Sequence, residues 1–172
     1  EMPRFWWAPY KLAVVLFEVG VLAVLVQLVR PAERTLVTWL YWLNPWVILH
    51  GGFPGFWEGA YLLCALWGIV ALRRIRSDGA AWLACGALLM CSAMLKPQGL
   101  VHFVGPLGLY LAVRSMRGST RLLQGYGMGV AAVVVSVSLL LWLAGGSALG
   151  VYHNYAFTFT TMPNLSNGGP NL

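Results

Sequence analysis

The chain has 172 residues, of which 59% are hydrophobic and 9% are charged, a composition that excludes a soluble domain. Its 11 Lys and Arg outnumber its 5 Asp and Glu, but these cations lie in short loops between apolar stretches. Membrane topology explains that pattern better than a nucleic-acid partner does. Because apolar stretches of near-spanning length recur and strand-type alternation does not, we predict an all-α fold, a polytopic transmembrane helical bundle.

Six apolar segments follow one another along the chain: 7–29, 36–49, 56–72, 80–95, 100–113 and 122–143. The first can span a bilayer unaided, whereas several others need tilt, aromatic flanks or local thinning. Asn44-Pro45 interrupts the second segment, which predicts a kinked or broken helix. The polar stretch 144–172 is predicted to be an external loop, so that residues 1–172 form a single transmembrane domain.

The arginines define an orientation. All except Arg4 cluster in three connections, which contain Arg30 and Arg34, then Arg73, Arg74 and Arg76, then Arg114, Arg117 and Arg121. The positive-inside rule places these loops in the cytoplasm. The segments then alternate without conflict, and the outer face receives the loop 50–57, the turn 96–98 and the stretch from Ala144.

The three cysteines, Cys64, Cys85 and Cys91, lie within apolar segments and lack metal-type spacing. We interpret them as packing residues. The sequence therefore implies no disulfide, no metal and no cofactor.

The first unusual stretch is 44–58, which contains His50 and several glycines and ends at Glu58. A proline-broken helix frees backbone groups, and glycines permit tight turns close to a ligand. Glu58 begins the next helix, where a carboxylate also suits the positive end of the helix dipole. Glu58 is therefore either a candidate catalytic residue or only a helix-start residue, and His50 is a candidate binding residue.

The second stretch is Lys96-Pro97-Gln98, a turn between two apolar segments. A cation at the bilayer centre costs about 2.5 to 3.5 kcal/mol, so Lys96 should lie at the outer interface or face a polar cavity. It could simply snorkel to the interface. Pro97 fixes the turn, however, and directs Lys96 and Gln98 to one place, as binding of a lipid phosphate would require. His102 could reach the same place, although a buried histidine is the simpler expectation.

The third stretch lies within 152–172 and combines aromatic and amide side chains, among them His153, Asn154 and Asn164. Such residues suit sugar rings, whose CH faces stack and whose hydroxyls need donors and acceptors. A solvated capping loop has the same composition.

The order of these pieces resembles the C-terminal part of bacterial polytopic glycosyltransferases of the GT-C superfamily, relatives of the polyprenyl-phosphate-sugar-dependent mannosyl and glucosyl transferases. In that family the first stretch commonly looks like Asn-Pro-x-x-Ile-x-x-x-Gly-x-x-Gly-Gln-x-Asp; here Phe56 replaces the glutamine and Glu58 the aspartate. The Lys-Pro-Gln turn matches in full, and the chain ends in Pro-Asn-Leu-Ser-x-x-x-x-Asn-Leu.

The resemblance implies a bacterial inner-membrane enzyme that moves a sugar from a polyprenyl-phosphate donor to an acceptor hydroxyl on the outer face, usually with inversion. An acidic residue would act as general base, and cations would hold the donor phosphate. The family's principal catalytic aspartate usually lies in a first external loop, and no such loop precedes Glu1. We therefore expect these residues to belong to a longer protein.

Two other classes remain open. Because Phe56 and Glu58 depart from the family pattern, the chain could be a non-catalytic subunit of a larger membrane complex with protein partners. Broken helices and intramembrane charges also mark transporters, although the absence of an inverted repeat argues against that class.

Glu18 lies within the first apolar segment, where a carboxylate is costly unless it is paired or faces a cavity. Lys11, on a similar helical face, is the partner that the spacing suggests. The sequence assigns Glu18 no role.

Overall fold

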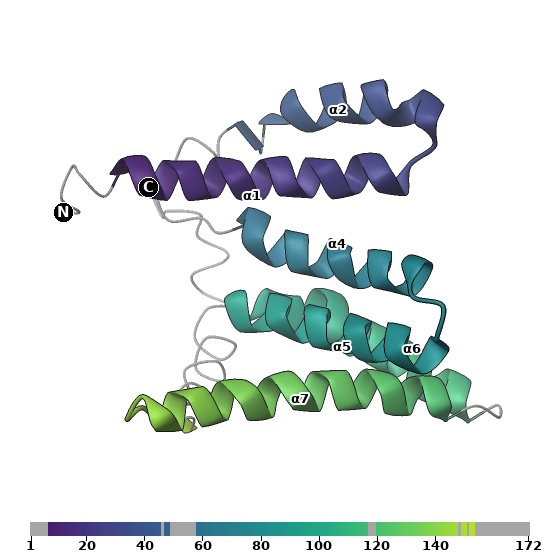
Figure 1. Ribbon diagram of the computed structural model, residues 1–172, viewed down its shortest axis with the longest axis vertical. Helices are drawn as coiled ribbons and strands as arrows, with labels where there is room; N and C mark the ends of the chain where they lie inside the picture. Colours follow the sequence, from purple (N-terminus) through teal and green to yellow (C-terminus); the bar gives the residue numbers. More distant parts are fainter. Residues whose placement is uncertain are drawn as a thin grey trace. The chain divides into compact units, whose positions relative to one another are not determined.

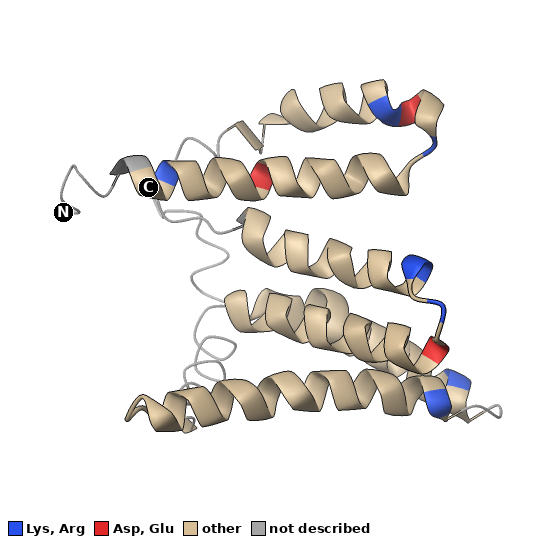
Figure 2. Cartoon of the chain, in the orientation of Figure 1, with Lys and Arg blue, Asp and Glu red and all other residues tan. Residues whose placement is uncertain are grey.

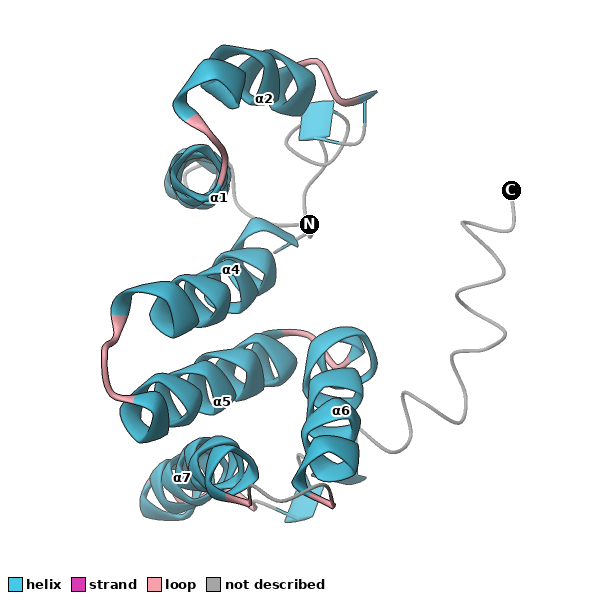
Figure 3. Cartoon of the chain, turned by 90° about the vertical axis from the view of Figure 1, so that its right-hand side faces the viewer, coloured by secondary structure: helices cyan, strands magenta, loops and turns pink. Residues whose placement is uncertain are grey.

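The computed structural model describes residues 7–45, 47–48, 58–116, 120–147, 149–150 and 152–153. These residues form six α-helices and no β-strand, so the all-α prediction is confirmed (Figures 1 and 3). The chain divides into two units, Glu1–Val130 and Ala131–Leu172, and the boundary falls within the last helix. The candidate residues that the structure describes in the first two unusual stretches all belong to the first unit.

The helices in chain order are α1 (Trp7–Leu28), α2 (Arg34–Trp42), α4 (Glu58–Arg74), α5 (Asp78–Leu95), α6 (Gly105–Ser115) and α7 (Arg121–Leu143). A 3-10 turn, η2 (Pro31–Glu33), precedes α2, and a π-helical segment, η3 (Leu100–Val104), runs directly into α6.

Helix α2 differs most from its predicted segment, because it ends at Trp42 rather than at residue 49. Asn44 is not helical, and helical backbone resumes at Pro45, where the Ile48 amide donates to the Asn44 carbonyl at 3.1 Å. A proline is well suited to the first position of a helix but not to its interior. The predicted break at Asn44-Pro45 is therefore present.

Among the residues that the structure describes, three helical stretches are long and apolar enough to cross a membrane: Pro9–Leu28, Asp78–Leu95 and Arg121–Leu143. Helix α4, with 17 residues, is slightly shorter, and the apolar stretch Leu100–Ser115 is shorter again. Helix α2 has nine residues and reaches less than half of a ~30 Å hydrocarbon core. These three long apolar helices give the described part of the chain the character of an integral membrane protein, and the shorter helices agree with the expectation that several segments fall below spanning length.

Pro106 accounts for the π-helical turn that precedes α6. A proline cannot donate to the carbonyl four residues earlier, and its ring collides with that carbonyl in regular α-helix. The backbone instead widens over Leu100–Val104, and the Gly105 amide donates to the Leu100 carbonyl five residues back. The wider turn joins the Lys96-Pro97-Gln98 corner to α6 without a loop.

Helix α5 occupies the centre of the first unit, between α4 and the first half of α7 (Figures 1 and 3). Small side chains make up much of its buried surface, including Ala81, Cys85, Gly86, Ser92 and Ala93. Within a bilayer, where lipid chains are as apolar as leucine, small residues favour helix association because they let backbones approach closely.

Helix α7 contacts α5 through glycines spaced four residues apart. A Cβ atom on Gly129 would lie 2.1 Å from the Leu83 carbonyl oxygen, and one on Gly125 would lie 3.0 Å from the Gly79 carbonyl oxygen. From the α5 side, a Cβ on Gly86 would lie 2.2 Å from the Tyr126 carbonyl oxygen. No side chain larger than hydrogen fits at Gly86 or Gly129 without separating the helices.

The described arginines gather at one end of the first unit (Figure 2). Arg73 Nη1 donates to the Leu28 carbonyl at 3.0 Å, and Arg74 Nη2 donates to Gln27 Oε1 at 2.7 Å, so α1 and α4 end side by side. The short connection 75–77 leads into α5 at the same end of the unit. The start of α7 lies there too, because Gly125 contacts Gly79 at the start of α5. We call this surface the arginine end.

In the second unit, part of the predicted loop 144–172 is helical. Leu149, Gly150, Tyr152 and His153 have helical backbone, and Ser147 Oγ accepts the Gly150 amide at 3.2 Å, as at a helix N-terminus. The Tyr152 hydroxyl lies 2.9 Å from Ser138 Oγ and 3.3 Å from the Val134 carbonyl. These polar contacts hold Tyr152 against α7.

The α5–α7 contact predicts opposite outcomes for two neighbouring glycines. Gly129→Ala should lower stability by about 1 to 3 kcal/mol, because its methyl group meets backbone atoms of α5. Gly127→Ala is the matched control, since a Cβ there meets nothing within 4 Å. Thermal unfolding in detergent measures both. Equal melting temperatures for the two variants would contradict this packing.

Candidate functional site

Lys96 lies at the opposite end of the α4–α5 hairpin from the arginines. Its Nζ is 5.3 Å from the centroid of the Tyr61 ring, a cation–π distance. Tyr61 lies in the first turn of α4, three residues after Glu58. The antiparallel hairpin thus brings the end of α5 beside the helix start that carries Glu58, whose side chain lies outside the described residues.

This end of the hairpin is level with the middle of α1, not with its beginning. A Cβ on Gly59 would lie 3.0 Å from Cβ of Phe17 and 3.0 Å from Oε1 of Glu18. Eleven residues of α1, about 16 Å of helix, therefore precede the level at which α4 begins. If α1 spans the bilayer, half-buried Lys96 lies below the outer surface, where a cation requires polar or aromatic partners.

The turn after α5 holds Lys96 in place through its backbone. The Lys96 amide donates to the Ser92 carbonyl at 3.0 Å, and the Gly99 amide donates to the Lys96 carbonyl at 2.9 Å. Gly99 packs directly on α5, because a Cβ there would lie 2.9 Å from Cα of Ala93. Gln98 is exposed.

Glu18 is a buried carboxylate shared by three helices. Its side chain is 8% exposed, and its Oε2 accepts a short hydrogen bond from the Tyr41 hydroxyl of α2. Its Oε1 faces Gly59 at the start of α4. Tyr41 precedes Asn44 by three residues and Gly59 follows Glu58 directly, so Glu18 holds both helices that flank the stretch 44–58.

Tyr41 and Tyr61 are the site residues that sequence reasoning missed. The sequence suggested Lys11 as a partner of Glu18, and the structure shows that the hydroxyl of Tyr41 donates a hydrogen bond to Glu18. Both tyrosines lie in aromatic-rich apolar segments, where rings usually anchor a helix at the interface. Only the packing of α2 on α1, and of α4 on α5, distinguishes them.

The remaining candidates divide by location. His50, Asn154 and Asn164 lie outside the described residues. His153 is exposed and belongs to the second unit. The expectation of a buried His102 is wrong: its side chain is exposed, and its ring lies 6.2 Å from that of Phe103. His102 belongs to η3 and lines an open groove, described below.

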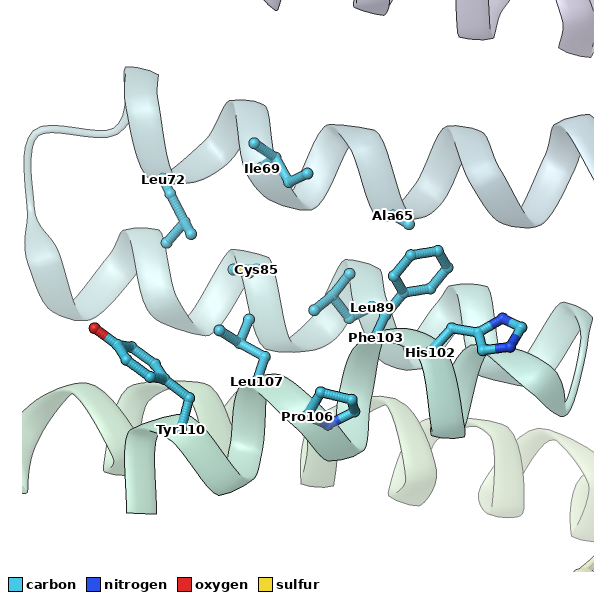
Figure 4. Close-up of a pocket in the computed structure, with 10 residues that line it drawn as sticks. All are labelled: Ala65, Ile69, Leu72, Cys85, Leu89, His102, Phe103, Pro106, Leu107 and Tyr110. Atoms are coloured by element: carbon cyan, nitrogen blue, oxygen red, sulfur yellow. The ribbon is translucent and has the colours of Figure 1, made fainter. Parts of the chain in front are cut away.

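An open groove of about 420 Å³ runs along α4, α5 and the η3–α6 helix (Figure 4). Its lining is mostly apolar and consists of Ala65, Ile69, Leu72, Cys85, Leu89, His102, Phe103, Pro106, Leu107 and Tyr110. At one end, the Phe103 ring lies 6.2 Å from that of Tyr61, next to Lys96. At the other end are Leu72 and Tyr110, close to the arginine end (Figure 4).

Comparison with known proteins yields no match: no family model, no curated protein and no solved structure matches this chain.

The Glu18–Tyr41 contact predicts strong coupling between the two positions. Tyr41→Phe leaves a buried acceptor without its donor and should cost about 1 to 3 kcal/mol of stability. Glu18→Leu should also destabilise, because the Tyr41 hydroxyl then lacks its acceptor. The double variant should be less destabilised than the sum of the single effects, by about 0.5 to 3 kcal/mol. Additive shifts in denaturant or thermal unfolding would show that the contact contributes nothing.

Proposed function

We propose that this chain is the membrane domain of a GT-C-like glycosyltransferase, which moves a sugar from a polyprenyl-phosphate donor to an acceptor hydroxyl. The observation that supports this most is the proximity of Lys96 to the start of α4, where Glu58 lies. Lys96 and Glu58, to which the resemblance assigns the donor and acceptor chemistry, are separated by 38 positions in the sequence. They nevertheless belong to neighbouring helix ends.

The roles follow from the charges. Lys96, with Gln98 beside it, binds the phosphate of the donor and stabilises the negative charge that grows as the bond from the anomeric carbon to the phosphate oxygen breaks. Glu58 accepts the proton of the acceptor hydroxyl while that oxygen bonds to the anomeric carbon. The sugar is transferred with inversion, and polyprenyl phosphate leaves.

The orientation in the membrane follows from the two ends of the first unit. The arginine end faces the cytoplasm of a bacterial cell, as the positive-inside rule requires, and the Lys96 end faces outward. The first half of α1 then shields the site laterally, since it extends beyond the start of α4. A recessed site of this kind lowers the local dielectric and strengthens the attraction between Lys96 and a phosphate.

Sugar transfer by the complete protein tests these roles. With a panel of radiolabelled polyprenyl-phosphate sugars in proteoliposomes, Lys96→Gln should lower transfer about 10- to 100-fold, the effect of losing a hydrogen bond to a charged group. Lys96→Arg should retain part of the activity, because it keeps the cation. Glu58→Gln should cost about 10²- to 10⁴-fold, as expected for a general base.

Arg76→Gln is the matched control, because it removes an exposed cation at the arginine end and should leave transfer unchanged. Parental turnover in both Lys96→Gln and Glu58→Gln would refute the site assignment. Transfer from none of the donors, together with copurification in a fixed stoichiometry with another membrane protein, would instead identify a non-catalytic subunit.

A further inference from the structure

The groove along α4, α5 and α6 has the depth of a single bilayer leaflet. From His102 to Tyr110 its wall covers eight residues, about 12 Å of helix, and half of a ~30 Å hydrocarbon core is about 15 Å. Its walls are apolar over most of this length, with Ile69, Leu89 and Leu107 facing the interior (Figure 4). A groove of this depth and lining suits one acyl chain that enters from one leaflet.

A cation lies at the end of this groove that faces the arginine end. Tyr110 lines the groove, and its hydroxyl accepts a hydrogen bond from Arg114 Nη1 at 3.4 Å. On the opposite wall, Leu72 lines the groove and is followed by Arg73. Along its axis the site therefore presents apolar surface, then a phenol, then an exposed guanidinium.

That order matches an amphiphile with an acyl chain, a polar linker and an anionic head group. We propose that the groove is a binding site for an anionic glycerophospholipid of the leaflet at the arginine end, with one acyl chain along Leu107 and the phosphate at Arg114. Guanidinium binds phosphate through paired hydrogen bonds, and basic pockets between membrane helices hold anionic head groups. A zwitterionic lipid gains less, because its ammonium group is repelled by the neighbouring arginines.

This site is distinct from the proposed donor site. Lys96 lies over the Tyr61 ring beyond the Phe103 end of the groove, whereas Arg114 lies at the Tyr110 end. The phospholipid site does not depend on sugar transfer, so each proposal can fail without the other.

Lipid counting by native mass spectrometry tests the site on the full chain. The detergent-purified protein is titrated with phosphatidylglycerol and phosphatidylcholine that carry identical acyl chains. Phosphatidylglycerol should bind about fivefold more tightly, because that is the gain in affinity expected when one basic side chain lies near an anionic lipid. Arg114→Gln should abolish this preference, because it lowers the affinity for phosphatidylglycerol more than that for phosphatidylcholine. Equal affinities in the parent protein, or an undiminished preference in Arg114→Gln, would overturn the proposal.

Two further comparisons locate the site and do not depend on the Arg114 variant. Leu107→Trp fills the groove and should reduce binding of both lipids, whereas Leu12→Trp, on a 61% exposed position of α1, should not. In the parent protein, raising the salt to about 1 M, where the screening length is about 3 Å, should remove most of the head-group preference. Unchanged binding in Leu107→Trp, or a salt-independent preference, would place the lipid elsewhere.

Polyprenyl phosphate is the competing occupant. If it displaces phosphatidylglycerol from the groove and its binding falls in Lys96→Gln but not in Arg114→Gln, the groove belongs to the donor and the phospholipid site is refuted. A loss of transfer in Lys96→Gln with unchanged phosphatidylglycerol binding supports both assignments.

Discussion

The close approach of α5 to its neighbours is the constraint on which the first unit depends. Glycine and alanine on its surface, and the glycines of α7 opposite, let backbones come within a distance that no larger side chain permits. With α5 fixed in this way, the short connection to α4 makes an antiparallel hairpin with two chemically different ends. One end carries arginines (Figure 2), and the other carries Lys96 beside Tyr61.

The charged side chains of the first unit lie where a bilayer tolerates them, at helix ends or beside a hydrogen-bond donor. The described arginines lie at helix ends, where two of them hydrogen-bond to the end of α1. The buried carboxylate of Glu18 is compensated by a tyrosine hydroxyl, which supplies a hydrogen bond without adding a second buried charge. Because Tyr41 and Gly59 flank the stretch 44–58, this costly residue also fixes the spacing of the helices on either side of the candidate loop. That arrangement gives Glu18 a positioning role that the sequence does not reveal.

Much of the helical organisation could be predicted from the sequence because it is local. Apolar runs, the arginine-rich connections and Asn44-Pro45 mark the helices and the break after Trp42. The π-helical turn is harder to predict from the sequence, because Pro106 explains it only once the chain is known to be continuously helical from Gly99. The partners of Glu18 and Lys96, and the groove from Leu72 to Phe103, depend on which helix faces which. No single segment contains that information, so the sequence pointed to Lys96 and Glu58 as candidates but not to the tyrosines.

The central claim is that the Lys96 end binds the phosphate of a polyprenyl lipid. Photocrosslinking tests it most directly, with a polyprenyl phosphate whose photoreactive group lies in the first isoprene unit, next to the phosphate. Peptide mapping of the irradiated full-length protein should find adducts at the start of α4 and in the Lys96–Phe103 turn, and competition by unlabelled polyprenyl phosphate should remove them. Adducts confined to the arginine end, around Arg74 and Arg114, would contradict the account.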